Sequence, residues 1–285
     1  MASERQPGAS RGKLDFATVA GLLVAGGGIL GGLVLEGGKL SDVAQYTAAL
    51  IVGLGTLGAV MVTTPPALLG SALRRFKDIV WDVAPPRQAL IEQLLQFARQ
   101  ARRSGIVSLE QEAEEIERDP FLKKALMLAV DGTDLQDLRR IMELEIEAAA
   151  RRGEAEAKVF ETAGGYSPTI GIIGAVLGLI QVMKHLEDIE RVGHGIAVAF
   201  VATVYGVGLA NLLFLPAGAK IKARLEQSIE DKELVLEGVL GIAEGMNPKL
   251  LENKLGAFLE SAESAAVSAS SSAAQTRAAE PATAP

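Results

Sequence analysis

Residues 164–183 read GGYSPTIGIIGAVLGLIQVM, an uncharged and mainly apolar stretch. A helix of about 20 apolar residues crosses a bilayer, so this stretch predicts a membrane-spanning helix. Gly171, Ala175 and Gly178 fall on one face of that helix, and such a strip of small side chains lets a neighbouring helix approach closely. Pro168 leaves one backbone carbonyl without its usual donor. We therefore expect a helix that can bend, at a place lined by protein or water.

Three further runs without charged residues complete a four-span pattern: residues 16–35, 44–73 and 195–219. Pro65 and Pro66 near the end of the second run indicate the membrane exit or a kink. The first run is longer than the about 7–15 apolar residues of a signal peptide, so a span is favoured over a signal peptide. The first and fourth runs also carry strips of small residues, namely Gly21, Ala25, Gly28 and Gly32, and Ala199, Thr203, Gly206 and Ala210.

The composition is that of a membrane protein with a sizeable polar portion, since 49% of the 285 residues are hydrophobic and the mean hydropathy is +0.27. The chain has no cysteine, which excludes disulfides and thiolate metal sites. The formal net charge of -7 argues against nucleic acid as a partner, because phosphate binding needs clustered Lys and Arg. His185 and His194 lack a third ligand or a nucleophile, so we expect no catalytic residue, metal site or cofactor.

Basic residues predict the orientation, because an excess of Lys and Arg marks the cytoplasmic side of short loops. They precede the first span and follow the second and fourth: Arg5, Arg11 and Lys13, then Arg74, Arg75 and Lys77, then Lys220, Lys222 and Arg224. Both termini, and the long segment between the second and third spans, are therefore expected in the cytoplasm.

That long segment predicts several amphipathic helices, because its apolar residues recur at helical spacing, as in Leu90, Ile91 and Leu94. Thr133 or Asp134 is expected to cap the helix that follows residues 131–134. The predicted fold is all-α: a polytopic membrane protein with four transmembrane helices and a helical cytoplasmic domain inserted between the second and third spans. Its segments are 1–15 (cytoplasmic N-terminus), 16–73 (first two spans), 74–163 (cytoplasmic domain), 164–219 (last two spans), 220–260 (cytoplasmic amphipathic helices) and 261–285 (disordered tail).

The four spans contain no Asp, Glu or His, the residues on which proton relays through bilayers normally depend. What they offer instead is a few hydroxyls and amides: Thr18, Thr56, Thr63, Thr169, Gln181, Thr203, Tyr205 and Asn211. If this protein conducts ions, the titrating group must therefore come from another chain.

Three segments carry a resemblance to a known family: residues 165–176 (GYSPTIGIIGAV), residues 197–206 (AVAFVATVYG) and the pair Leu215-Pro216. They resemble the A-subunit of the bacterial flagellar stator, the MotA, MotC and PomA group within the wider family that includes ExbB and TolQ. The likeness extends over about residues 14–260 and includes the large loop after the second span.

The resemblance implies a pentameric ring of A-subunits in the bacterial inner membrane, around a dimer of a MotB-like B-subunit whose single transmembrane helix supplies an aspartate. The ion path then runs along the third and fourth spans. Pro168 and Pro216 match the family prolines that couple ion passage to movement, and Thr203 matches a polar residue facing the ion path. Arg102 and Glu110 match the charged pair that meets the rotor protein FliG.

Each of these roles has a plainer alternative. Pro168 and Pro216 can also be simple entry and exit residues, because prolines are common in membrane spans. Thr203 is equally able to bond its own backbone one turn earlier. Arg102 and Glu110 lie in a charged helical stretch, which usually means a solvated face.

Ion choice depends on Ala175, seven residues past Pro168. The resemblance implies that sodium-driven relatives carry a threonine there, whose oxygen helps to replace the water shell of sodium. Ala175 offers no oxygen, which favours protons, whereas Thr169 and Ser167 keep sodium open.

Two other functions stay open from the sequence. ExbB and TolQ energise transport or envelope maintenance, although their layout has three spans with the large loop after the first. A passive helical scaffold without ion flow is the third possibility. Membrane lipid is an expected partner of the four spans.

Overall fold

The computed structural model describes residues 13–82, 87–117 and 119–259. The expected N-terminal segment before residue 13 and the expected disordered tail lie outside this range. The described chain is helical except for one antiparallel pair of two-residue strands, β1 (Lys13–Leu14) and β2 (Trp81–Asp82), which confirms the all-α prediction. It forms two compact units: residues 1–84 with 151–225, here called the membrane unit, and residues 85–150 with 226–285, here called the helical unit.

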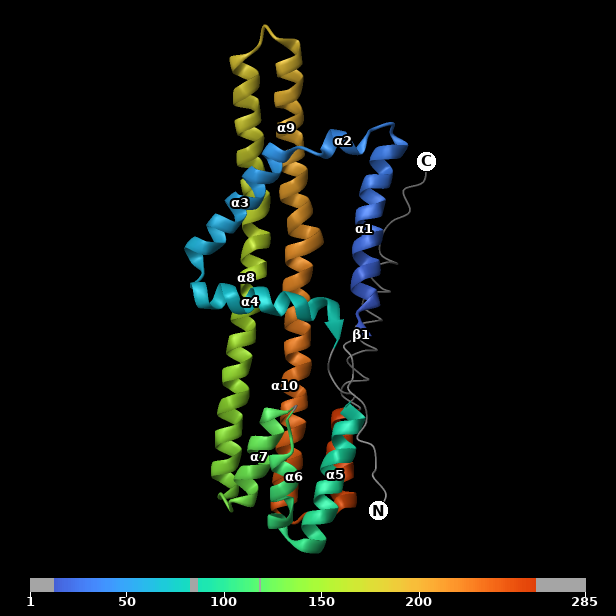
Figure 1. The fold of residues 1–285 in the computed structure, drawn as a ribbon, viewed down its shortest axis with the longest axis vertical. Coiled ribbons are helices and arrows are strands. Elements are labelled where there is room, and N and C mark those ends of the chain that lie inside the picture. Colours follow the sequence, from blue (N-terminus) through green and yellow to red (C-terminus); the bar gives the residue numbers. More distant parts are fainter. Residues whose placement is uncertain (1–12, 83–86, 118, 260–285) are drawn as a thin grey trace. The chain divides into compact units, whose positions relative to one another are not determined.

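Within the described residues, four helices are long and apolar enough to cross a membrane (Figure 1). The membrane unit contains all or part of each of them. Its elements are α1 (Phe16–Leu35), α2 (Leu40–Val43), α3 (Tyr46–Thr63), α4 (Pro66–Val80), the second part of α8 (Leu135–Lys184), α9 (Ile189–Gly208), η2 (Leu209–Phe214) and the start of α10 (Leu215–Ala243).

Helices α8 and α9 approach each other closely through glycine, as the strips of small residues predict. A Cβ atom placed on Gly206 would lie 2.6 Å from the carbonyl oxygen of Ser167, and one on Gly171 would lie 2.9 Å from that of Ala202. Farther along the pair, a Cβ on Gly178 would lie 2.8 Å from the carbonyl oxygen of Gly195. Backbone therefore contacts backbone, and any side chain at these glycines would force the helices apart.

The small strip of α1 is different. Nothing lies within 4 Å of a Cβ placed on Gly21, Gly28 or Gly32 in the part of the chain that the structure describes. Helix α1 buries none of its residues, so the close contact that its sequence predicts is not made with any other described residue of this chain.

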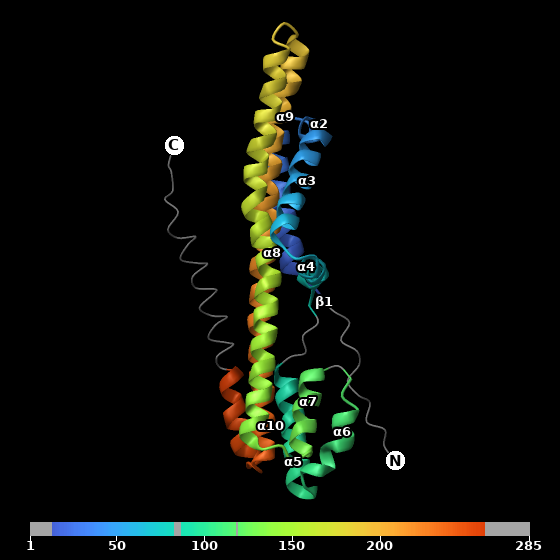
Figure 2. The same ribbon diagram turned by 90° about the vertical axis from the view of Figure 1, so that its left-hand side faces the viewer.

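Helix α3 packs on the α8–α9 pair, and α4 lies across it. Ala48 and Val52 of α3 form a buried cluster with Val201 and Ala202 of α9. The chain leaves α3 at Thr63 and re-enters a helix at Pro66, where a first-turn proline costs no hydrogen bond. Helix α4 then runs at a steep angle to α3, α8 and α1, as both views show (Figures 1 and 2).

An ion pair fastens α4 to α8. Arg75 donates to Glu156 at 2.9 Å, and the side chain of Glu156 is only 5% exposed. A carboxylate this deeply buried needs such a partner, because an unpaired buried charge is strongly destabilising.

Two features of the last spans were not predicted from the sequence. Helix α8 is continuous from Leu135 to Lys184 and passes through Pro168 without ending, so no break separates the region before residue 163 from the third span. The six residues before α10, η2, form a π-helix, and Pro216 follows directly in the first turn of α10. A wider turn suits a proline, because the proline nitrogen has no hydrogen to complete the preceding α-helical turn.

The N-terminal end of α1 is anchored by charged residues. Asp15 caps α1 by accepting from the backbone nitrogen of Thr18 at 3.1 Å, and it pairs with Lys220 and with Arg224, the latter at 3.2 Å. The hydrogen bond from Lys220, aided by the bond from Thr18, outweighs partial burial and lowers the pKa of Asp15 from 3.8 to about 2.

Asp15→Asn should lower stability by about 1 kcal/mol, after allowance for solvent screening, because asparagine caps a helix as well as aspartate but cannot form the ion pair. Because folding depresses this pKa, the stabilisation is complete above about pH 4 in the wild type and is lost as the pH falls from there towards 2. Thermal unfolding of the detergent-solubilised chain checks this, with Glu36→Gln at the other end of α1 as the control. Equal unfolding temperatures for the two variants would contradict it.

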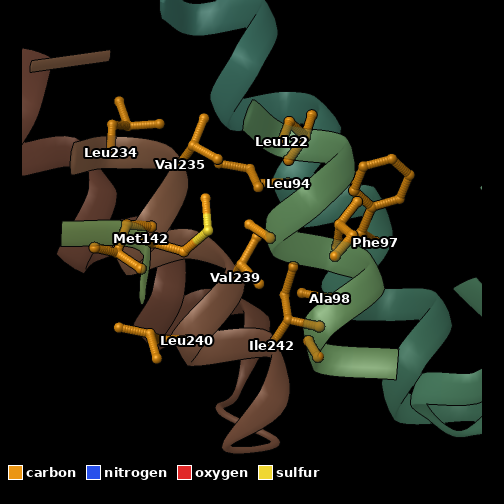
Figure 3. Close-up of a cluster of buried hydrophobic side chains, with 14 of the residues drawn as sticks. Leu94, Phe97, Ala98, Leu122, Met142, Leu234, Val235, Val239, Leu240 and Ile242 are labelled. Carbon is orange, nitrogen blue, oxygen red and sulfur yellow. The ribbon is translucent and has the colours of Figure 1, made fainter. Parts of the chain in front are cut away.

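The helical unit is built around one apolar core. It contains α5 (Arg87–Ser104), η1 (Ile106–Leu109), α6 (Glu110–Glu114), α7 (Pro120–Val130), the first part of α8, the end of α10 and a helix at residues 248–259. Leu94 of α5, Leu122 of α7, Met142 of α8 and Val239 of α10 meet in this core (Figure 3). Asp134 caps α8 through the backbone nitrogen of Gln136 at 2.8 Å, which confirms one of the two predicted caps.

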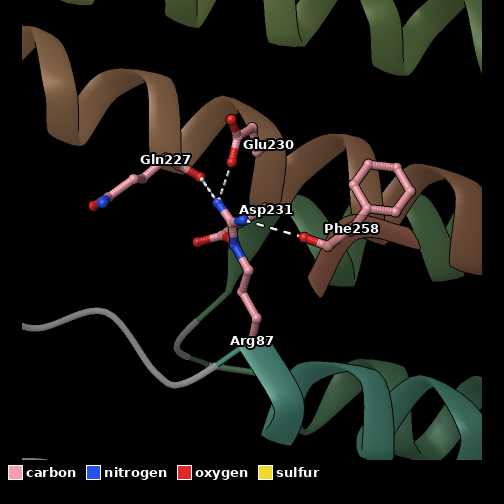
Figure 4. A network of polar contacts seen from close by, with 5 residues as sticks. All are labelled: Arg87, Gln227, Glu230, Asp231 and Phe258. Atoms are coloured by element: carbon pink, nitrogen blue, oxygen red, sulfur yellow. Dashed lines mark hydrogen bonds and ion pairs between the residues drawn. The ribbon is translucent and has the colours of Figure 1, made fainter. Parts of the chain in front are cut away.

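Arg87 ties the start of α5 to α10 and to the helix at residues 248–259 (Figure 4). Its guanidinium donates to Glu230 at 2.5 Å and to Asp231 at 2.6 Å, and it also reaches the carbonyl oxygens of Gln227 and Phe258. The planar guanidinium group holds several donors in a fixed geometry, which suits bonding to several acceptors at once. Arg87 therefore holds the first turn of α5 against α10.

Candidate functional site

Pro168 and Thr203 lie at the same level of the α8–α9 pair. Their neighbours Ser167 and Ala202 make the close backbone contacts with Gly206 and Gly171, respectively. Both Pro168 and Thr203 are half-buried within the chain. Pro168 and Thr203 therefore each lie next to a close backbone contact between α8 and α9.

Two threonine hydroxyls near this level donate to their own helices. Thr203 Oγ1 donates to the carbonyl oxygen of Ala199 at 3.2 Å, as the plainer alternative expected. Thr169 does the same towards Tyr166 at 2.8 Å. A hydroxyl has one hydrogen and two lone pairs, so each of these oxygens is left as an acceptor. Thr203 can thus receive a hydrogen bond but has no hydrogen left to offer a carboxylate.

The hydroxyls of the membrane unit that are buried without a partner among the described residues include Ser167 Oγ and Thr56 Oγ1. Ser167 is fully buried and Thr56 is 2% exposed. The sequence shows both as hydroxyls near the spans, but only the fold reveals that they are enclosed. Ala175 is half-buried on the same helix as Ser167 and presents only a methyl group.

Pro216 lies in the first turn of α10, next to the turn of α8 that precedes Pro168. The adjacent residue, Leu215, packs on Gly164, where a Cβ would lie 2.6 Å from Leu215 Cδ2. Pro216 itself is exposed. The π-helical turn before it was not foreseen from the sequence, because no residue pattern distinguishes six π-helical residues from an ordinary apolar turn.

Arg102 and Glu110 lie in the helical unit, at the end of α5 and the start of α6. Gly105 has φ of +84° and turns the chain between them, a conformation that glycine adopts without strain. Gln100 Nε2 bridges the turn by donating to Glu112 Oε1 at 2.5 Å. Arg102 and Glu110 are exposed, and neither forms a hydrogen bond or ion pair within the described residues. This turn therefore leaves one cation and one anion exposed.

The helical unit has a cleft of about 460 Å³ that is lined by several glutamates. One of them, Glu237, is explained by ion pairs that stabilise the fold. It accepts from Arg139 at 2.7 Å and from Lys254 at 2.5 Å. Partial burial acts to raise the pKa of Glu237, but the bonds from Arg139 and Lys254 outweigh it and hold the pKa below its ordinary value. No group of His, Cys, Asp and Glu suited to a metal ion occurs among residues 13–82, 87–117 and 119–259.

Known proteins share this arrangement. A model of the MotA/TolQ/ExbB proton channel family matches residues 113–234. Motility protein A of Bacillus subtilis is 36% identical over 250 residues, covering 86% of this chain and 91% of that protein. Two solved structures match at 35% identity: C. jejuni MotAB, with a TM-score of 0.82 over 86% of this chain and 96% of that chain, and the flagellar MotAB stator complex from Bacillus subtilis, with a TM-score of 0.78 over 85% and 95%.

The four apolar helices and the match to a proton channel family define an ion-channel subunit of a bacterial membrane. The chain belongs to the MotA/TolQ/ExbB proton channel family, and within it to the motility A proteins of the flagellar stator. Its function is therefore that of an ion-conducting stator subunit. The transport alternative is less supported, because these relatives are stator proteins and the described chain has four candidate spans, whereas the resemblance implies three for ExbB and TolQ.

Proposed function

We propose that this chain conducts protons only together with a MotB-like subunit whose transmembrane aspartate carries them. The observation that carries the proposal is the lack of Asp, Glu and His in the four apolar runs of a proton-channel family member. The two matching structures are those of MotAB, one of them described as a stator complex, which supports a partner of this kind. A pentameric ring of this chain around two such partners is the assembly we propose.

Thr203 would favour the protonated form of the partner's acid. Its oxygen only accepts, because its hydrogen is already given to Ala199. A protonated carboxyl group can donate to that oxygen, whereas an ionised carboxylate can only accept and gains nothing there. Protonation therefore changes which position of the partner helix is preferred, which is a shift between two populations.

Pro168 and the π-helical turn before Pro216 give the α8–α9 pair two places where backbone geometry can adjust. One charge crossing the membrane supplies about 2.3 kcal/mol per 100 mV. That amount suits a small shift of packed helices rather than refolding. Ala175 offers no oxygen, so a dehydrated sodium ion would lack a ligand at this position, which supports protons.

The proposal also includes the orientation of the chain in the membrane and its contact with the rotor. Both termini and the helical unit face the cytoplasm, following the basic flanks of the spans. Arg102 and Glu110 then steer the rotor protein FliG through complementary charge, repeated around the ring.

Thr203→Val keeps the shape of the side chain and removes its oxygen. Losing one hydrogen bond to the transferring acid costs about 1.5–3 kcal/mol, which should lower proton conductance by about ten- to a hundredfold and stop swimming. Pro168→Ala should also stop swimming, because it removes the bend point of α8. Ser71→Ala is the control, since Ser71 Oγ likewise donates to its own helix, at 3.0 Å from the carbonyl oxygen of Leu68, but lies on α4. Normal motility in both variants, at normal membrane levels, would contradict the proposal.

Arg102→Glu and Glu110→Lys should each weaken the binding of purified FliG by about two- to fivefold, the size expected for exposed ion pairs. The loss should shrink at high salt, because exposed charges are screened. Glu117→Lys, an exposed carboxylate farther along the chain, is the matched control. A reversal variant that binds as tightly as the control at low salt would remove Arg102 or Glu110 from the rotor contact.

A further inference from the structure

A cleft opens in the membrane unit where α3 gives way to α4. Its volume is about 320 Å³. Residues of the α3–α4 junction form one wall and residues of α8 form the other: Thr63, Thr64, Pro65 and Leu68, and Ala155, Lys158, Val159, Thr162 and Tyr166. The residues of the proton path proposed above do not line this cleft.

The cleft lies at the edge of the apolar zone. Helix α3, which is long and apolar enough to span, ends at Thr63 beside it. Helix α4 lies across the spans there, with Ala72 buried while Leu73 and Arg74 stay exposed (Figure 2). An amphipathic helix lying in the plane and an aromatic side chain such as Tyr166 are both typical of the headgroup layer.

A cation and a phenol remain able to donate within the cleft. Lys158 Nζ gives one hydrogen bond to Glu161, at 3.0 Å, and the Lys158 side chain is 73% exposed, so two of its three hydrogens are available. The hydroxyl of Tyr166 forms no hydrogen bond among the described residues. By contrast, Thr63 and Thr162 already donate to backbone carbonyls of their own helices.

We propose that this cleft binds the phosphate of an anionic phospholipid. Lys158 and Tyr166, two turns apart on the same face of α8, would hold the phosphate oxygens. Leu68 and Val159 provide apolar surface on which the first part of an acyl chain can lie. A soluble phosphate would use the same donors but would leave that apolar surface wet.

Glu161 provides a specific test, because its negative charge should weaken the binding of a phosphate. Its carboxylate pairs with Lys158 and repels a phosphate. Glu161→Gln should therefore strengthen lipid binding, whereas Lys158→Gln should weaken it. A purely structural role of the Lys158–Glu161 pair would make both variants change in the same direction.

The experiment measures phosphatidylglycerol retained by the full-length chain in detergent, by native mass spectrometry. Lys158→Gln should lower retention about fivefold, Glu161→Gln should raise it by a similar factor, and Tyr166→Phe should lower it about twofold to fivefold. Lys222→Gln, an exposed lysine of α10, is the control and should leave retention unchanged. Phosphatidylcholine should be retained less than phosphatidylglycerol, and glycerol phosphate should fail to displace the lipid at equal concentration.

Equal retention by Lys158→Gln and wild type would overturn the proposal. Displacement by glycerol phosphate at equal concentration would also overturn it, because the cleft would then recognise a soluble phosphate. Neither readout involves ion flow or swimming, so this inference and the proposed function fail independently.

Discussion

Gly206→Leu is expected to destroy the α8–α9 contact and with it ion conduction. A Cβ at this position would lie 2.6 Å from the carbonyl oxygen of Ser167 and 3.0 Å from the Cα of Gly171. Both neighbours are backbone atoms, so no flexible side chain can move aside. Overpacking a tight contact costs about 1–3 kcal/mol, and we expect at least the upper end here because two helices must separate.

Thermal unfolding in detergent and proton flux in vesicles check this expectation. Gly165→Leu is the matched control, because it adds the same side chain to α8 at a position where nothing lies within 4 Å. An unfolding temperature and flux for Gly206→Leu equal to those of Gly165→Leu would show that the close approach of α8 and α9 is dispensable.

Leu94→Ala is expected to destabilise the helical unit by about 2–5 kcal/mol, the usual range for a fully buried leucine. Leu94 is completely buried and packs against Gly238, where a Cβ would lie 2.7 Å from Leu94 Cδ1. The variant leaves a cavity in the core that also holds Leu109, the residue before α6. Torque should therefore fall even though Leu94 is buried and itself touches no rotor.

The unfolding midpoint of the purified chain and the swimming speed of cells carrying the variant measure these losses. Leu144→Ala on α8 serves as the control, because Leu144 is 55% exposed. If the two variants unfold alike, the core assignment is wrong.

The four-helix membrane pattern and the glycine contact between α8 and α9 could be predicted because both depend on local sequence. Charge-free length identifies a span, and small residues at helical spacing identify a face. The contact of Gly171 with Gly206 confirms that reasoning. The strip on α1 shows its limit, because the same pattern there meets nothing within the described chain.

The continuity of α8 and the burial of individual side chains could not be predicted, because both depend on tertiary packing. A proline usually predicts a helix end, yet α8 runs on through Pro168 for a total of 50 residues. The π-helical turn before Pro216 and the enclosure of Ser167 leave no mark in the residue pattern. Helices α8 and α10 each supply residues to both the membrane unit and the helical unit, and the residue pattern gives no sign of this sharing.

The two interpretations of Thr203 are compatible. Its hydrogen bond to Ala199 satisfies the plainer alternative, and the same bond leaves the Thr203 oxygen as a pure acceptor. A residue that bonds its own backbone is thereby prepared to distinguish a protonated acid from an ionised one.

The central claim is that the proton carrier belongs to the partner chain. Proton flux should be measured in vesicles containing this chain alone, this chain with its MotB-like partner, and this chain with a partner whose transmembrane aspartate is replaced by asparagine. We predict flux only in the second preparation. Flux through this chain alone, or undiminished flux with the asparagine partner, would contradict the account.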